Sequence, residues 1–364
     1  MNGVIAFLSI LLVGCTTAVS PDHKGNDTLG VAIPSPASLE FICKHEKLPA
    51  PSAESDVLFK YARWLQKGNQ LKRDAVTNTE IERLYRIAAE QGHAKANVNL
   101  QNGAMRKQFK LRGHEYLRLT EQLIDQEVAT GYLFVSYFLR QGAFGLKQDE
   151  IMALRYMRKA ADEGNPEAQY YVGEKLAPVD VAPQVARLMR RCAAEQGHGK
   201  AAVALGVYLM LKGIHREALE ALQLGVAAGY GSAPSRLADT FAAVPTDQWA
   251  YLGEPQDPER ARRYKEIWRI LANYSYANPK VPEINEIVPL PPIKLPPWDG
   301  KLQWLEERLA NIPPERPSEA LIMRLAKEKA LDPATGKPGT CLADHKARAP
   351  GSSCAAETWG RELQ

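Results

Sequence analysis

The sequence predicts an all-α protein: a right-handed α/α solenoid of helical hairpins that ends in a proline-rich strap and a helical C-terminal cap. The six residues at 88–93, Ala-Ala-Glu-Gln-Gly-His, recur unchanged at 193–198, with weaker copies at 160–165 and 227–230. The glycines of these copies, together with a poorer copy at Gly131, are separated by 39, 33, 33 and 32 residues. A repeat period in the thirties is typical of stacked helical hairpins.

Residues 149–164 show why one repeat should fold as a hairpin. The apolar and small residues that share one helical face in this stretch are Ala153, Tyr156, Met157, Ala160 and Ala161. Asp149 is a suitable N-cap because its side chain can accept hydrogen bonds from free backbone amides. Gly164 suits the left-handed position that ends a helix, and a second helix follows from Pro166.

This pattern resembles the Sel-one-like repeat, a relative of the tetratricopeptide hairpin. The shared residues are Asp149, Ala153, Tyr156, the alanine pair 160–161 and Gly164. The resemblance covers roughly residues 79–240. It implies a scaffold that binds proteins and that carries no catalytic motif of its own.

The N-terminus predicts export and lipid attachment. Residues 5–14 form an apolar stretch that is too short to span a bilayer, as in a signal peptide. The residues Leu12-Val13-Gly14-Cys15 resemble a bacterial lipobox, which implies that Cys15 carries lipid, although Met1–Val4 lacks the usual Lys or Arg. Thr16 stands where an aspartate would favour the inner membrane, so we expect outer-membrane attachment facing the periplasm. The alternative is a buried N-terminal helix with an incidental cysteine.

Composition divides the chain into four parts. We expect a signal peptide at 1–14, a lipid-anchored flexible tether at 15–52, the repeat solenoid at 53–245 and a C-terminal region at 246–364. The tether is expected because Pro, Ser, Gly, Asn and Thr predominate between residue 16 and about residue 52, with little hydrophobic periodicity.

The C-terminal region should begin with one more helix and then become extended. Asp257 and Pro258 are suited to the N-cap and first position of that helix. Seven prolines within the 19 residues from 279 to 297 oppose a helix and favour a polyproline-like strap. Recurrent Ile and Leu in the strap predict that it packs against the solenoid. Two further helices are expected near 300–311 and 317–329.

The chain has five cysteines, which leaves four if Cys15 is lipidated. An even number in an oxidising compartment fits disulfides. Cys341 and Cys354 enclose a short Gly/Ser/Pro-containing loop, and bridging them would stabilise the fold by about 3 kcal/mol. We therefore predict that pair. Cys192 should lie buried on an inward helix face, and a bridge from Cys192 to Cys43 is also possible.

No motif in the chain predicts an enzyme, a cofactor or a metal centre. The sequence lacks a Gly-x-Ser-x-Gly elbow, a His-Glu-x-x-His pair, a Walker loop, a Cys-x-x-Cys pair and the His-Lys-Asp signature of phospholipase D. Cys43, His45 and Glu46 could ligate a metal, but no second cluster supports them. His93 and His198 occupy equivalent repeat positions and are best interpreted as hairpin-turn residues. A formal net charge of +4 is too small to predict binding of nucleic acid.

Two groups of residues are candidates for contact with a partner. The densest basic run contains Arg106, Lys107, Lys110 and Arg112 and could bind an acidic protein or lipid headgroups, although a solvated helix face is the simpler interpretation. Trp298 and Asp299 could form an interface hot spot, or a turn that a buried indole anchors.

The strap from Asn285 to Gly300 and the tail around Cys341 and Cys354, after such repeats and a lipobox, are similar to a group of bacterial envelope lipoproteins. Some members are immunity proteins for type VI secretion effectors of the phospholipase D class. The resemblance implies a periplasmic protein that binds a cognate phospholipase effector and blocks it sterically, using a concave solenoid face and adjoining loops. The alternative is an envelope scaffold that organises other membrane or cell-wall proteins.

Overall fold

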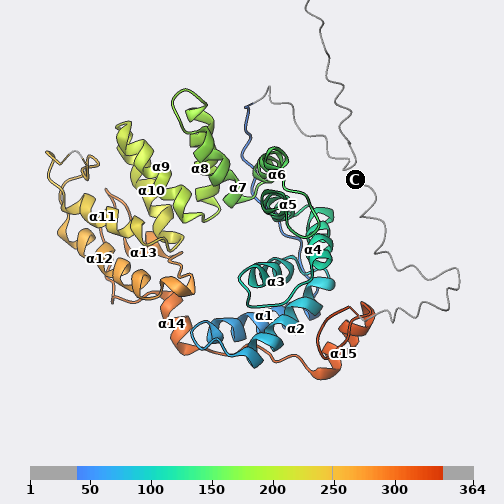
Figure 1. The fold of residues 1–364 in the computed structure, drawn as a ribbon. Helices are drawn as coiled ribbons and strands as arrows, with labels where there is room; N and C mark the ends of the chain where they lie inside the picture. The colour runs from blue at the N-terminus through green and yellow to red at the C-terminus, as the bar shows by residue number, and fades with distance from the viewer. Residues whose placement is uncertain (1–38, 248, 339–364) are drawn as a thin grey trace, which may run out of the picture. The chain divides into compact units, whose positions relative to one another are not determined.

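The computed structural model describes residues 39–247 and 249–338. The regular secondary structure of these residues is helical, apart from one isolated bridge between Leu331 and Pro338. The helices are α1 (Ala53–Asn69), α2 (Ala75–Glu90), α3 (Ala94–Met105), α4 (Gly113–Asp125), α5 (Thr130–Gln141), α6 (Glu150–Asp162), α7 (Pro166–Leu176), α8 (Pro183–Glu195), α9 (Gly199–Leu211), α10 (His215–Ala227), α11 (Ser232–Ala242), α12 (Pro258–Asn273), α13 (Ile284–Ile287), α14 (Gln303–Ala310) and α15 (Glu319–Glu328). Each helix from α1 to α12 packs on the next one along the chain (Figure 1), which confirms the predicted α/α solenoid. In the described residues, none of the helices has both the length and the apolar character needed to cross a bilayer.

Local capping signals start the repeat helices where the sequence predicts. Asp149 and Asp257 each accept a hydrogen bond from the amide three residues further on, at 2.9 Å, and Pro258 occupies the first position of α12. His93 and His198 do the same for α3 and α9 through the ring atom Nδ1. Both histidines are thus turn residues, as expected.

The alanine pairs lie at the contacts between the helices of the hairpins. Ala193 and Ala194 of α8 pack on Ala201 and Ala202 of α9, and all four are at most 1% exposed. Small side chains at these positions let the two helices approach closely. The two largest core clusters are centred on α1–α5 and on α9–α12, and two further small clusters lie around α5–α7 and at α8.

The strap packs against the last hairpins, as its apolar residues predict. Ile284, Ile287 and Leu290 are buried in the second core cluster, whereas Ile293 is 62% exposed. One expectation is wrong: residues 284–287 form a single helical turn, α13. The turn is possible because six residues without proline separate Pro282 from Pro289.

Beyond the strap, the chain returns to the first helices of the array. Arg83 of α2 binds Glu319 at 2.8 Å and the Pro333 carbonyl at 2.7 Å, and Trp64 of α1 donates to Asn311 at 3.1 Å. The apolar face of α15 joins the first core cluster. The predicted helical C-terminal cap therefore covers the beginning of the solenoid, and the described residues form one compact unit.

The expected flexible tether at 15–52 is wrong for residues 39–52. Phe41 is buried against Met189 and Cys192 of α8, and Gln169 of α7 donates to the Lys44 carbonyl at 2.8 Å. The segment lacks a hydrophobic period because it lies extended across successive repeats and contacts a different one every few residues. Cys15 lies outside the described residues.

Candidate protein-binding surface

The solenoid has two edges, which we name by their connections. The turn edge holds the short connections within hairpins, namely residues 91–93, 126–129, 163–165, 196–198 and 228–231. The loop edge holds the connections between hairpins, namely residues 106–112, 142–149, 177–182, 212–214 and 243–257. Alternate helices run in opposite directions in an α/α solenoid, so the two kinds of connection lie at opposite ends of the helices.

The protein's own terminal segments cover the turn edge. Gln91 donates to the Leu325 carbonyl of α15 at 2.9 Å. The turn at Gly164 lies against His45 and Glu46, and the turn at Gly229 lies against Pro279 and Lys280. Glu46 also contacts Gln196 in a fourth turn, and it binds Thr130, the first residue of α5, next to the remaining turn.

Glu46 is the residue that ties the N-terminal segment to three repeats. Its Oε1 accepts from the backbone amide and hydroxyl of Thr130, and its Oε2 accepts from Asn165 at 3.4 Å. Its backbone amide donates to Gln196 Oε1 at 2.9 Å. Both oxygens of the carboxylate therefore accept hydrogen bonds within the fold.

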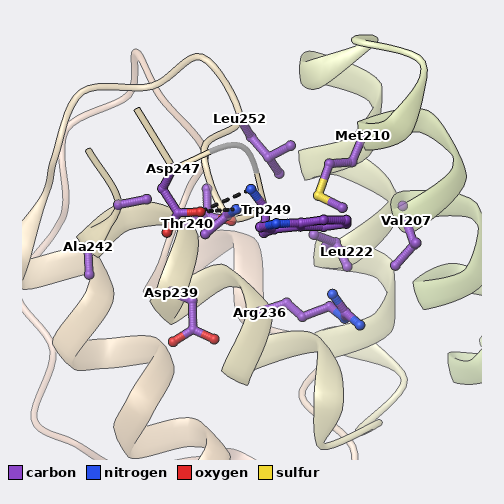
Figure 2. Close-up of a pocket in the computed structure, with 13 residues that line it drawn as sticks. Val207, Met210, Leu222, Arg236, Asp239, Thr240, Ala242, Asp247, Trp249 and Leu252 are labelled. Carbon is purple, nitrogen blue, oxygen red and sulfur yellow. Dashed lines mark hydrogen bonds between the residues drawn. The ribbon is translucent and has the colours of Figure 1, made fainter. Parts of the chain in front are cut away.

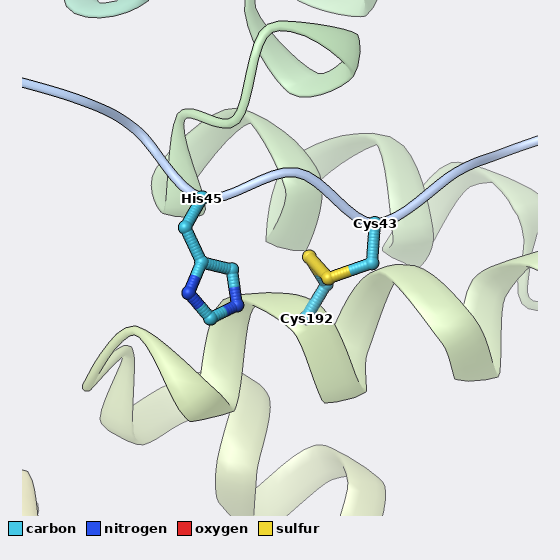
Figure 3. Close-up of side chains that lie close together, drawn as sticks. All are labelled: Cys43, His45 and Cys192. Carbon is cyan, nitrogen blue, oxygen red and sulfur yellow. A yellow bond between two sulfur atoms is a disulfide. The ribbon is translucent and has the colours of Figure 1, made fainter.

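A disulfide joins Cys43 to Cys192 and fixes the same segment to α8 (Figure 3). His45 lies next to this bridge, and the ligand atoms of the three residues lie within 4.8 Å of one another. Both sulfurs are bonded to each other and are not thiolates, so this group cannot hold a metal as a set. Of the two bridges considered from the sequence, this one is formed. Cys341 and Cys354 lie outside the described residues, and their pairing stays a prediction.

The loop edge exposes apolar side chains, and Leu39, Ile42 and Leu48 of the N-terminal segment are exposed as well, at 45%, 72% and 41%. Val179 and Val181 in the connection after α7 are 89% and 48% exposed. Leu211 at the end of α9 is 66% exposed, Ile214 after it 37%, and Trp249 in the connection after α11 77%. Exposed apolar groups that recur along one edge are typical of a protein-binding surface.

A pocket of about 410 Å³ opens at this edge between α9, α10, α11 and the connection 243–257. Its apolar walls include Val207, Met210, Leu222, Ala243 and Leu252, and its polar residues are Arg236, Asp239, Thr240 and Asp247. Figure 2 shows the Trp249 indole lying across the pocket beside Met210 and Leu222, with Arg236 on the same side. The carboxylate of Asp247 holds the loop in place by accepting from the amides of Trp249 and Ala250, at 2.9 and 3.1 Å.

The predicted basic residues also lie in a connection of the loop edge. Arg106, Lys107, Lys110 and Arg112 are all exposed. The connection is fixed by Phe109, which is 4% exposed and packs edge-on against Tyr85 with the ring centres 6.1 Å apart. The predicted role of the four basic residues in partner contact stays a prediction. They lie on an anchored loop and not on a helix face.

Trp298 and Asp299 form the turn expected as the simpler interpretation. The half-buried Trp298 indole packs on the second core cluster and donates to the Lys301 carbonyl at 2.8 Å. Asp299 accepts from the Lys301 amide at 3.0 Å. Since the basic loop contacts α2 and this turn contacts α12, the structure does not bring the two predicted groups together. A role of Trp298 in an interface stays a prediction.

Comparison with solved structures identifies proteins of similar architecture. Immunity protein Pa5087 from Pseudomonas aeruginosa is 25% identical, with a TM-score of 0.53, over 70% of this chain and 95% of its own. Immunity protein PA5088 from the same organism is 24% identical, with the same score and coverage. Protein PA5086 of that organism is 25% identical, with a TM-score of 0.52, over 70% of this chain and 96% of its own. The predicted resemblance to immunity proteins is confirmed.

Sequence families add one local match. Residues 233–339 match the model of a domain of unknown function, DUF6396. The matched residues include α11 from its second residue, α12, the strap and the C-terminal cap. No curated protein sequence matches the chain. The match begins at the pocket and covers the segments that return to the turn edge.

Proposed function

We propose that the protein is an immunity protein that binds a cognate toxin effector and blocks it. The observation that carries this proposal is the shared architecture with immunity protein Pa5087, at 25% identity over 95% of that protein. We further propose that the effector is a type VI secretion phospholipase of the D class, because the strap and tail resemble those of its immunity lipoproteins. The protein would act in the periplasm, held at the outer membrane by lipid on Cys15.

The mechanism that fits the molecule is steric occlusion. The turn edge is covered by the terminal segments, so the loop edge is the side that is free to meet a large partner. It offers exposed apolar groups and the four cations of residues 106–112, which together suit a protein surface with acidic character. The protein would not be an enzyme, and its effect on the phospholipase would depend on binding alone.

Protection of living cells tests this function. A phospholipase D-class effector directed to the periplasm is expressed with and without this protein, and growth and membrane phospholipid are measured. We expect rescue by the full chain and also by Cys15→Ser carried on a soluble export signal, because the body alone should occlude the effector. Toxicity that persists across several such effectors, with folded protein in the periplasm, would contradict the proposal.

An envelope scaffold remains the second candidate, because exposed apolar residues along one edge also suit several weak partners. Affinity separates the two functions. Binding of one effector with a Kd of about 1 nM would favour immunity, whereas several partners with a Kd of about 1 µM or weaker would favour a scaffold.

A further inference from the structure

The Trp249 pocket combines three features that suit the binding of a side chain from a partner. Trp249 is 77% exposed, although burial of the large apolar surface of an indole is favourable. Its backbone is held by the carboxylate of Asp247, so the loop presents the indole in a defined place. The indole lies across a cavity of about 410 Å³, which is large enough for one or two side chains of a partner.

The charges at the pocket indicate the chemistry of the occupant. The Arg236 side chain is exposed and makes no ion pair or hydrogen bond with any residue in the described part of the chain. Its guanidinium lies on the same side of the pocket as the indole (Figure 2). Asp247 is occupied by backbone amides. Asp239 also lines the pocket and is exposed, but Figure 2 shows Arg236, and not Asp239, beside the indole, so the charged side chain next to the indole is a cation. The basic connection 106–112 on the same edge is positively charged as well.

We propose that this pocket is the anchor site for the effector, and that it receives an aromatic or aliphatic side chain that stands next to a carboxylate. The apolar side chain would fill the space between Trp249, Met210 and Leu222, and the carboxylate would pair with Arg236. Burial of an exposed tryptophan together with an arginine is the composition of an interface hot spot. This inference rests on the proposed function, because the occupant belongs to the effector.

Trp249→Ala and Arg236→Glu test the site. The probe is the phospholipase D-class effector that the wild-type protein neutralises in cells, titrated against purified full chain. We expect Trp249→Ala to weaken binding about 30-fold, as for a hot-spot truncation of 2 kcal/mol. Arg236→Glu should weaken it about tenfold or more, with a smaller loss at high salt. Neither variant should lower the unfolding temperature, since both side chains are exposed.

Matched controls lie on α12, outside the pocket. Trp268→Ala removes another exposed indole, 40% exposed, and Lys265→Glu reverses another exposed cation. Both should bind as the wild type does. If all four variants bind as tightly as the wild type, the anchor site is wrong while the immunity function stands. If the wild-type protein binds no effector, both proposals fall. Loss of binding in the α12 variants alone would place the interface elsewhere and would overturn the inference.

Discussion

His93 and His198 are the same residue at the same position of two repeats, yet their surroundings differ. The His93 side chain is 2% exposed and lies 3.4 Å from Asp56 of α1, whereas His198 is 12% exposed and lies 2.8 Å from Glu167. Burial lowers the pKa of His93 below its ordinary value of 6.5, and the hydrogen bond with Asp56 opposes that shift. The additional cover from α1 therefore lowers the pKa of His93.

This difference predicts a pH-dependent stability. His93 takes up a proton less readily in the folded protein than in the unfolded chain. The contribution of neutral His93 to the free energy of unfolding is therefore complete above pH 6.5 and is lost as the pH falls below that value. His93→Asn keeps a capping side chain and should flatten the fall in unfolding free energy between about pH 7.5 and 5.5, by up to about 1.4 kcal/mol per pH unit. Urea unfolding measures it, with His198→Asn as the control. An unchanged slope in His93→Asn would contradict the assignment.

The disulfide gives a second prediction for single residues. Cys43 and Cys192 are 149 residues apart, so their bond closes a long loop in the unfolded chain. Replacing both by serine should lower the unfolding free energy by about 5 kcal/mol on the chain-entropy model. Urea unfolding compares this variant with Cys341→Ser/Cys354→Ser, for which the shorter predicted loop gives about 3 kcal/mol. Peptide mapping of the unreduced protein identifies the bonded pair. Finding Cys43 and Cys192 in separate peptides would contradict the structure.

Among the structural elements, the hairpin turns show how the same sequence signal acquires a second role. Gly197 and Gly229 both have left-handed backbones, with φ of +83° and +73°. A Cβ on Gly197 would meet nothing within 4 Å, whereas a Cβ on Gly229 would lie 1.8 Å from the Pro279 carbonyl oxygen. The second glycine is needed both for its own conformation and for the seat of the strap.

Alanine substitutions separate these two requirements. Gly197→Ala should cost about 1–2 kcal/mol, which is the strain of a left-handed alanine. Gly229→Ala should cost roughly 1–3 kcal/mol more, because the strap must move away from the turn. Thermal unfolding gives the difference, and proteolysis of the strap should accelerate only in Gly229→Ala. Equal losses would show that the strap does not depend on this contact.

The same comparison explains what the sequence can and cannot predict. Asp149, Gly164 and the alanine pairs act on their own helices, so the hairpins and their ends are predictable from local residues. Arg83 and Glu319 meet across 236 positions, and no local pattern encodes that contact. Trp249 was missed for a similar reason: a single tryptophan in a polar connection has no periodicity, and only the fold sets it over a pocket.

For the whole molecule, the important contact is the one between the last helix and the first ones. Leu325 of α15 is 2% exposed and belongs to the core of α1–α5, whereas its neighbour Arg324 binds Glu54 and Glu328 at the surface. Apolar burial is the stronger of these effects, since surface ion pairs contribute about 0–1 kcal/mol. The cap should therefore be held by its buried face.

Adjacent substitutions test this at the level of the whole fold. Leu325→Ala should lower the unfolding free energy by about 2–5 kcal/mol and should raise hydrogen exchange in α2. Arg324→Ala should leave both the unfolding free energy and the hydrogen exchange in α2 nearly unchanged, because its ion pairs lie at the surface. If both variants behaved alike, the cap would not be part of the first core.

The bridge at Cys43 has a mechanical consequence. A force applied through the chain before residue 39 and resisted by the C-terminal region would pass through the sulfur–sulfur bond directly into α8. Helices α1–α7 lie between the two cysteines, so this force would not pass along their backbone. They could not contribute contour length to an extended molecule while the bond is intact. The basic connection 106–112 lies in this part of the solenoid, so no tension would pass along its backbone while the bond is intact.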